Sequence, residues 1–308
     1  MARVMAMRDP TVASLAEFVD AISGWGFDPR EEVSLSHAAN WLQRLGNDRT
    51  FLGDLLVDML AGLSPVPDGA DALAGVGPES IMLVTPGQGN FFLNARIWPA
   101  PGDSQFRASG PEAFGYGQAH DHNYDLLALG YFGPGYLSDE YEYDREAVSW
   151  HVGQSVQLRP QGPLVLEQGR IFHYRAQRDV HVQHPPASLS VALNLVHTQP
   201  GQAWMDHCEF DIERGTVTRL LGHGPSESFL RIAVALGGEE ALDIASRFGK
   251  SHPSDRMRLV AWDALASGTA DAALRDAVWR DAEQCGSRWV AAEARKRRGE
   301  EAARQFTT

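Results

Sequence analysis

The chain has 308 residues, of which 44% are hydrophobic and 22% are charged, and its formal net charge is −13 at pH 7. This length is enough for one large domain or for a medium domain with helical additions, and the hydrophobic content excludes a disordered chain. An acidic surface repels a phosphate backbone, so nucleic acid is not an expected partner.

The cysteines and the lengths of the apolar segments indicate where in the cell the protein is expected. Cys208 and Cys285 are the two cysteines, and neither belongs to a Cys-x-x-Cys motif. This argues against a disulfide framework and against a cysteine-based zinc site. The first ten residues lack the apolar segment of a signal peptide, and no run approaches the roughly 18 apolar residues of a membrane span. We therefore expect a soluble cytoplasmic protein with no membrane partner.

The N-terminal region carries apolar residues at helical spacing, which predicts three helices. The first covers residues 11–22, the second runs from about Ser36 to Gly46, and the third begins near Asp48. Segment 64–69 contains two prolines and a glycine and predicts a linker. We expect residues 1–78 to form an N-terminal helical region whose apolar stripes are packing surface.

From about Ser80 the pattern changes to short β-branched and aromatic runs that are separated by turn residues. About ten such strands follow before residue 222, which favours a β-sandwich or barrel over a parallel α/β sheet. We expect residues 79–222 to form this β-domain. From Ser226 the helical period resumes, and residues 223–308 are expected to form a C-terminal helical region with a faint likeness to HEAT-type repeats.

The segment from Gln118 to Asp125 reads as a β-strand with a His-x-His pair. Alternate residues of a strand point to the same face, so His120 and His122 would project together, about 7 Å apart. Tyr124 shares their parity and would also face inward. Asp125 has the opposite parity and would point away, unless a bulge turned it towards the histidines. The pair predicts a metal site that takes further ligands from elsewhere in the chain.

The preferred third ligand is His181, which lies on another apolar, β-branched segment about sixty residues downstream. His184 and His173 stay open as substitutes if the register differs. A histidine that does not bind the metal could donate a hydrogen bond to one that does. Asp125 stays open as an additional carboxylate ligand.

The β-region resembles the cupin superfamily. In that superfamily a first motif carries His-x-His after a glycine, and it matches residues 115–133, with His120 and His122 in the histidine positions. A second motif has a glycine followed about eleven residues later by a histidine, and it matches residues 169–194 with His181. The resemblance covers roughly 140 residues. It implies a double-stranded β-helix, or jelly-roll, barrel with a metal site inside.

One position departs from the cupin pattern, because the place of the usual glutamate ligand is held by Leu126 or Leu127. A cupin with three histidines resembles the cysteine dioxygenase branch, whose members use non-haem Fe(II) and O₂. The chain also departs from that branch, since residues 188–192 lack its Ser-x-His-x-Tyr relay and no cysteine lies on the strands before His120. Arg96 does match the place of the carboxylate-binding arginine of that branch.

The three histidines alone do not determine which metal binds or which reaction the site catalyses. Neutral imidazoles bind Fe(II), Zn(II) and Ni(II), and three protein ligands leave positions open for substrate and O₂ or for water. Aromatic residues near the motif suit a small organic substrate. Tyr124, Arg96 and Arg175 are the candidates for orienting it, the two arginines through an anionic group.

We therefore expect an enzyme, an Fe(II)-dependent dioxygenase that acts with O₂ on a small organic, carboxylate-bearing molecule. Two alternatives stay open. One is a cupin isomerase, lyase or hydrolase that uses Zn(II), Mn(II) or Ni(II) without O₂ chemistry. The other is a non-enzymatic ligand-binding cupin. A homodimer is expected from the habit of cupins.

Overall fold

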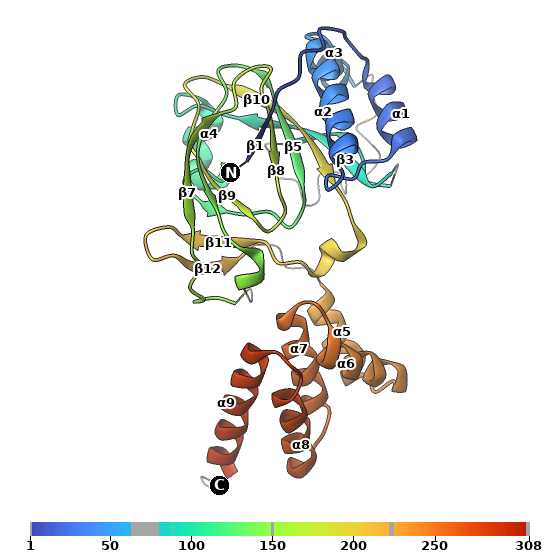
Figure 1. Cartoon of the computed structure of the whole chain (residues 1–308), viewed down its shortest axis with the longest axis vertical. Helices are drawn as coiled ribbons and strands as arrows, with labels where there is room; N and C mark the ends of the chain where they lie inside the picture. Colours follow the sequence, from blue (N-terminus) through green and yellow to red (C-terminus); the bar gives the residue numbers. More distant parts are fainter. Residues whose placement is uncertain (1, 63–79, 88, 149–150, 222–224, 306–308) are drawn as a thin grey trace. The chain divides into compact units, whose positions relative to one another are not determined.

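The computed structural model describes residues 2–62, 80–87, 89–148, 151–221 and 225–305 (Figure 1). The predicted linker at 64–69 and the predicted domain boundaries after residues 78 and 222 lie outside these residues. The chain divides into two compact units. The first comprises Met1–Arg145, Gln157–Gln202 and Glu209–Gly215, and the second comprises Glu146–Val156, Ala203–Cys208 and Thr216–Thr308.

Three helices open the first unit: α1 (Leu15–Trp25), α2 (Glu32–Asn47) and α3 (Phe51–Leu60). The sequence placed the start of α1 too early, at residue 11. Ser14 is the true N-cap, because its side chain accepts a hydrogen bond from the backbone N–H of Glu17, whose carboxylate accepts from the backbone N–H of Ser14 at 2.8 Å. This capping box fixes the first turn of the helix. The second helix begins four residues before the predicted Ser36.

The first unit contains two antiparallel sheets. In sheet A the strand order is β1 (Arg3–Met5), β8 (Ile171–Tyr174), β5 (Leu126–Phe132), β10 (Ser190–His197), β3 (Phe91–Trp98) and β2 (Ser80–Val84). In sheet B the strands run in the order β11 (Cys208–Asp211), β4 (Ala119–His120), β9 (Asp179–Gln183), β6 (Leu137–Glu142) and β7 (Arg159–Val165). Short helical pieces lie between strands: α4 (Ser104–Ser109) and the 3₁₀ turns Pro111–Phe114, Arg145–Ala147 and Pro200–Trp204.

Strand β5 shows how the layers are arranged. Leu127 and Leu129 pack with Phe18 of α1 and Leu42 of α2. Leu126 and Ala128 belong to a second apolar cluster, which contains the aromatic side chains of Phe172 and Tyr174. Alternate residues of a strand face opposite sides, so one face of sheet A is covered by α1–α3 and the other forms an inner face. Across that inner side, Tyr174 of β8 contacts His181 of β9 in sheet B. The two sheets therefore face each other.

The predicted fold is confirmed in part. Two antiparallel sheets with added helices are present, as expected, but neither sheet closes into a barrel among the described residues. Sheet A ends at β1 on one side and at β2 on the other, and these two strands do not pair. A strongly twisted sheet closes only when its first and last strands can pair, and here both edges remain separate.

The second unit consists mainly of helices: α5 (Ser226–Ala235), α6 (Glu239–Ser251), α7 (Asp255–Ser267), α8 (Ala272–Glu283) and α9 (Arg288–Gln305), with β12 (Thr216–Leu220) before them. Helix α7 serves two cores, because Met257 and Ala261 pack with α5 while Trp262 packs with Trp279 of α8. Among the described residues, none of the helices combines the length and the apolar character needed to cross a bilayer.

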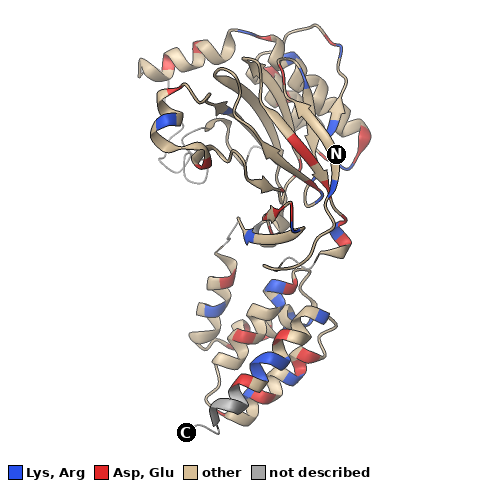
Figure 2. Ribbon diagram, turned by 90° about the vertical axis from the view of Figure 1, so that its left-hand side faces the viewer, with Lys and Arg blue, Asp and Glu red and all other residues tan. Residues whose placement is uncertain are grey.

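Charges of both signs alternate along the helices of the second unit (Figure 2). The basic run of α9 is an example, since Arg297 pairs with Asp263 of α7, and Arg298 pairs with Asp276 and Glu283 of α8. These ion pairs make the basic residues of α9 part of a helix surface of mixed charge.

Candidate metal centre

Three histidines of the first unit come together on the inner side of sheet B. His120 ends β4 and pairs in register with His181 of β9, so their side chains leave the sheet on the same face. The ring centroids of His120 and His181 are 4.5 Å apart, and those of His122 lie 5.2 and 5.1 Å from them. These ring contacts group His120, His122 and His181, and their role as metal ligands stays a prediction.

His122 reaches the group by a different route from the one predicted. Strand β4 ends at His120, and the chain then crosses from sheet B to β5 of sheet A. In this crossing the backbone N–H of Gln177 donates to the carbonyl of His122 at 2.7 Å, and the hydroxyl of Tyr143 donates to the fully buried Asp121 at 2.6 Å. A tethered turn, rather than strand alternation, therefore positions His122.

His120 is held in the form that a metal requires. Burial lowers the pKa of His120 to about 4, with a smaller lowering from the charge of Arg96, so its imidazole is neutral at pH 7. Its Nδ1 lies 2.9 Å from the carbonyl oxygen of Gln118, which can only accept, so Nδ1 carries the hydrogen. The lone pair of His120 is therefore on Nε2, the atom that faces His181.

The spacing of the nitrogens fits a shared ion. The Nε2 atoms of His120 and His181 are 3.1 Å apart. Two nitrogens that each bind one ion at about 2.1 Å lie about 3.0–3.4 Å apart for bond angles between octahedral and tetrahedral values. His122 offers a ring nitrogen within 4.8 Å of that of His120. Imidazoles at this spacing form a donor set that suits Fe(II), Zn(II) or Ni(II).

Two further residues selected from the sequence lie beside the histidines. The ring of Tyr124 stacks on His122 with centroids 4.8 Å apart, and burial raises the pKa of its hydroxyl. Arg96 donates to the carbonyl of Phe114 at 3.2 Å and covers the ring of Trp98 at 4.6 Å. Its charge is close enough to lower the pKa values of both His120 and Tyr124.

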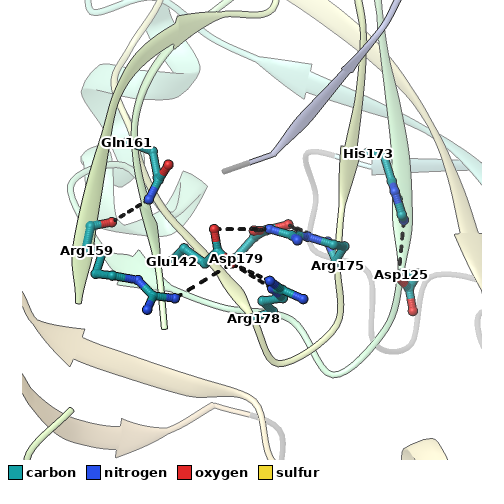
Figure 3. Close-up of polar contacts among 8 residues, drawn as sticks. All are labelled: Asp125, Glu142, Arg159, Gln161, His173, Arg175, Arg178 and Asp179. Atoms are coloured by element: carbon teal, nitrogen blue, oxygen red, sulfur yellow. Dashed lines mark hydrogen bonds and ion pairs between the residues drawn. The ribbon is translucent and has the colours of Figure 1, made fainter. Parts of the chain in front are cut away.

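The open alternatives for the metal ligands have other partners. His173 lies 3.2 Å from Asp125, and both are buried on the side of sheet A that carries Leu127, opposite Tyr174 (Figure 3). His184 lies 2.8 Å from Asp139, in a pair whose side chains are 39% and 46% exposed. Parity accounts for Asp125, because it precedes β5 in phase with the residues that face the helices.

Arg175 is engaged by two acidic residues. Its guanidinium lies 2.5 Å from Asp179 and 3.6 Å from Glu142, and Figure 3 shows it directed towards both. Asp179 has a fully buried side chain, so this pair balances a buried carboxylate. Together with His173, Arg175 lines a separate cavity on the first unit.

A buried carboxylate that the sequence did not single out lies next to the histidines. Glu140 of β6 pairs in register with His181 and is 1% exposed. Its Oε1 accepts hydrogen bonds from Ser138 at 2.5 Å and from Tyr174 at 3.3 Å. Its Oε2 has no hydrogen-bond partner among the described residues. Burial raises the pKa of this carboxyl to about 7.

Sequence reasoning missed Glu140 for a definable reason. The run Glu140-Tyr141-Glu142-Tyr143 alternates acidic and aromatic residues, which is typical of a strand with its acidic face exposed. Only the pairing of β6 with β9 reveals that Glu140 shares a face with His181. The signal that could have found it is the parity of Glu140 with Ser138, both of which are buried.

No protein-family model matches the chain, and no curated protein matches it. A structure of DMSP lyases matches at 15% identity with a TM-score of 0.22, over 38% of this chain and 46% of that one. A hydroquinone 1,2-dioxygenase in complex with Cd²⁺ and 4-hydroxybenzonitrile matches at 14% identity with a TM-score of 0.21, over 36% and 60%. A candidate mannose-6-phosphate isomerase from Ralstonia eutropha matches at 14% identity with a TM-score of 0.18, over 40% and 89%.

The chain therefore spans about half of the DMSP lyase chain and 60% of the dioxygenase chain. TM-scores this low carry no argument about activity. The chemistry of the centre has to be inferred from the residues that form it.

Glu140 should make the free energy of unfolding depend measurably on pH. Its folded-state pKa of about 7 lies above its ordinary value of 4.5. The contribution of this carboxyl to the free energy of unfolding is therefore full below pH 4.5 and is lost as the pH rises through 7. In metal-free protein, Glu140→Gln should gain stability relative to wild type between about pH 5 and pH 8, by at most about 3 kcal/mol.

The measurement is urea unfolding of both proteins in the presence of a chelator across this pH range. The difference between variant and wild type isolates Glu140, because His120 titrates in both. Glu112→Gln, which changes an exposed carboxyl of the same unit, is the control. Parallel profiles for Glu140→Gln and wild type would show that Glu140 is not a destabilised buried acid.

Proposed function

We propose that the first unit is a metal-dependent enzyme in which His120, His122 and His181 hold a divalent ion, and that the ion is Fe(II) used with O₂. The observation that carries the proposal is the convergence of three histidine rings, two of them with Nε2 atoms 3.1 Å apart. The burial of His122 and His181 supports it, because a buried polar cluster is costly unless its groups are satisfied.

The residues around the histidines support a small organic substrate. An ion with three protein ligands keeps positions open for substrate and O₂. The inner face of sheet A supplies apolar and aromatic walls, which include Trp98, Phe172 and Tyr174. Tyr124 extends this wall next to His122. A mostly apolar space with a few polar groups is the usual character of small-molecule sites.

Arg96 supports a negatively charged group on that substrate. It is a partly buried cation close to His120 and Tyr124, as its effects on their pKa values indicate. A guanidinium in such surroundings binds a carboxylate strongly, because planar paired hydrogen bonds form in a low dielectric. We therefore propose a dioxygenase that acts on a small organic carboxylate.

A second candidate function is favoured by Glu140. A buried carboxyl next to the histidine cluster, with one oxygen lacking a partner, suits proton transfer to or from a substrate. This would serve a lyase, isomerase or hydrolase that uses Zn(II), Mn(II) or Ni(II) and consumes no O₂. Incorporation of deuterium from the solvent into product, without O₂ uptake, would favour this candidate.

Metal content tests the proposed ligands. Protein purified without air should contain close to one equivalent of metal per chain, and His181→Ala should lose most of it, because only two of the three imidazoles remain. His184→Ala is the matched control, since it removes a histidine three residues away that pairs with the partly exposed Asp139. Metals are quantified by inductively coupled plasma mass spectrometry.

Equal metal content in wild type and His181→Ala would contradict the assignment of His181. A loss that is equally large in His184→Ala would point to general damage or to another site. A folded wild-type protein with no affinity for any divalent ion would remove the basis of both enzymatic candidates.

The substrate class is tested with paired compounds. Iron-loaded protein should consume O₂ on addition of members of a panel of small carboxylic acids, but not on addition of the matching amides. Arg96→Met should remove the preference for acid over amide by raising KM for the acid by about tenfold or more, as expected for the loss of a charge-assisted hydrogen bond. An oxygen electrode records the rates.

Equal responses to acids and amides in wild type would contradict the role of Arg96. Absence of O₂ uptake across the panel, together with stoichiometric zinc or manganese in the purified protein, would favour the second candidate.

A further inference from the structure

A cavity of about 620 Å³ lies on the first unit, away from the three histidines. It is lined by Arg3, Val4, Pro29, Arg30, Glu32, Leu35, His173 and Arg175. These residues come from β1, from the start of α2 and its preceding loop, and from β8 and its end. His173 has the opposite parity to Tyr174, which packs on the inner face, so the cavity lies on the helix-covered side of sheet A.

The lining carries an excess of positive charge. Three arginines and one glutamate line the cavity, in a chain whose net charge is −13. Arg3 pairs with Glu32 at 2.6 Å, and Arg175 pairs with Asp179. The side chain of Arg30 has no acidic partner among the described residues. A cavity that concentrates cations in this way attracts anions.

His173 adds a directed polar group. Its Nε2 lies 3.2 Å from Asp125, whose carboxylate can only accept, so Nε2 carries a hydrogen (Figure 3). This bond fixes the ring, which is 4% exposed, and leaves Nδ1 as the second polar atom of a side chain that lines the cavity. Nδ1 has no hydrogen-bond partner among the described residues. With the hydrogen on Nε2, Nδ1 carries the lone pair, so it can accept a hydrogen bond from a hydroxyl group of a ligand.

The remaining lining is apolar. Val4, Pro29 and Leu35 supply hydrocarbon surface opposite the charged groups. A bare inorganic ion would gain nothing from this surface, whereas an organic anion would bury its carbon atoms there. The volume is in the range of small-molecule sites.

We propose that this cavity is a second ligand site, which binds a small organic anion: Arg30 holds the anionic group, and Nδ1 of His173 accepts a hydrogen bond from a hydroxyl group of the same ligand. The anionic group is a carboxylate or a phosphate, both of which match the guanidinium geometry. Asp125 acts by positioning His173. The site is distinct from the histidine centre and does not depend on the proposed function, because its residues bind no metal in that proposal.

The test is isothermal titration calorimetry of the full chain in chelator, with succinate and with glycerol 3-phosphate as separate probes. One site per chain is expected for at least one of them, and the preferred probe identifies the anionic group. Arg30→Gln should weaken that binding by about tenfold, the loss of one charge-assisted hydrogen bond. Because Arg30 is exposed, this variant should fold as wild type does.

Arg178→Gln is the matched control, since it removes the same charge from an exposed arginine that pairs with Glu142 and does not line the cavity. Its affinity for the probe should equal that of wild type. His181→Ala should also bind the probe normally, which separates this site from the metal centre. Absence of binding by both probes, or equal weakening in Arg30→Gln and Arg178→Gln, would overturn the proposal.

Discussion

The structure of the candidate centre depends on one row of cross-strand pairs in sheet B. Strand β9 places His181 between His120 of β4 and Glu140 of β6, in register with both. Because the backbone ladder fixes each position, the three side chains leave the sheet at the same level and on the same face. This row brings an imidazole pair and a carboxylate into a buried space, where unsatisfied polar groups each cost about 1–3 kcal/mol.

That cost explains why the side chains and carbonyl groups around His120, His181 and Glu140 supply hydrogen-bond partners on a face that is otherwise apolar. Ser138 and Tyr174 satisfy one oxygen of Glu140, Gln118 satisfies one nitrogen of His120, and the facing nitrogens of His120 and His181 have each other. An ion between the imidazoles would satisfy their lone pairs together. The proposed metal would in this way offset part of the cost of burying the cluster.

Strand β8 separates the two candidate sites of the first unit. Its residue Tyr174 contacts His181 on the inner side, while the preceding His173 pairs with Asp125 and lines the cationic cavity on the other side. The alternation of a single strand therefore gives consecutive residues to two different sites. The same alternation explains why His173 and Arg175, which share parity in the sequence, occur together in the cavity.

The sequence was informative where the pattern is local. Spacing identified the helical and β regions, and Tyr124 stacks on His122 although neither residue lies on a strand. It failed where pairing between distant strands decides the outcome. Nothing local indicates that the strand ends at His120 or that Glu140 faces inward, because both follow from the register of β4 and β6 against β9. Sheet closure is equally non-local, and the predicted jelly-roll barrel is not confirmed, because neither sheet closes among the described residues.

The most direct test of the metal centre is X-ray absorption spectroscopy at the iron K-edge, on wild-type protein loaded with Fe(II) without air. The account predicts a shell of nitrogen or oxygen neighbours at about 2.1 Å, together with the outer-shell scattering that imidazole rings produce, fitted by three histidines. A spectrum of oxygen neighbours without imidazole scattering would contradict it, because the ion would then be bound elsewhere than at His120, His122 and His181.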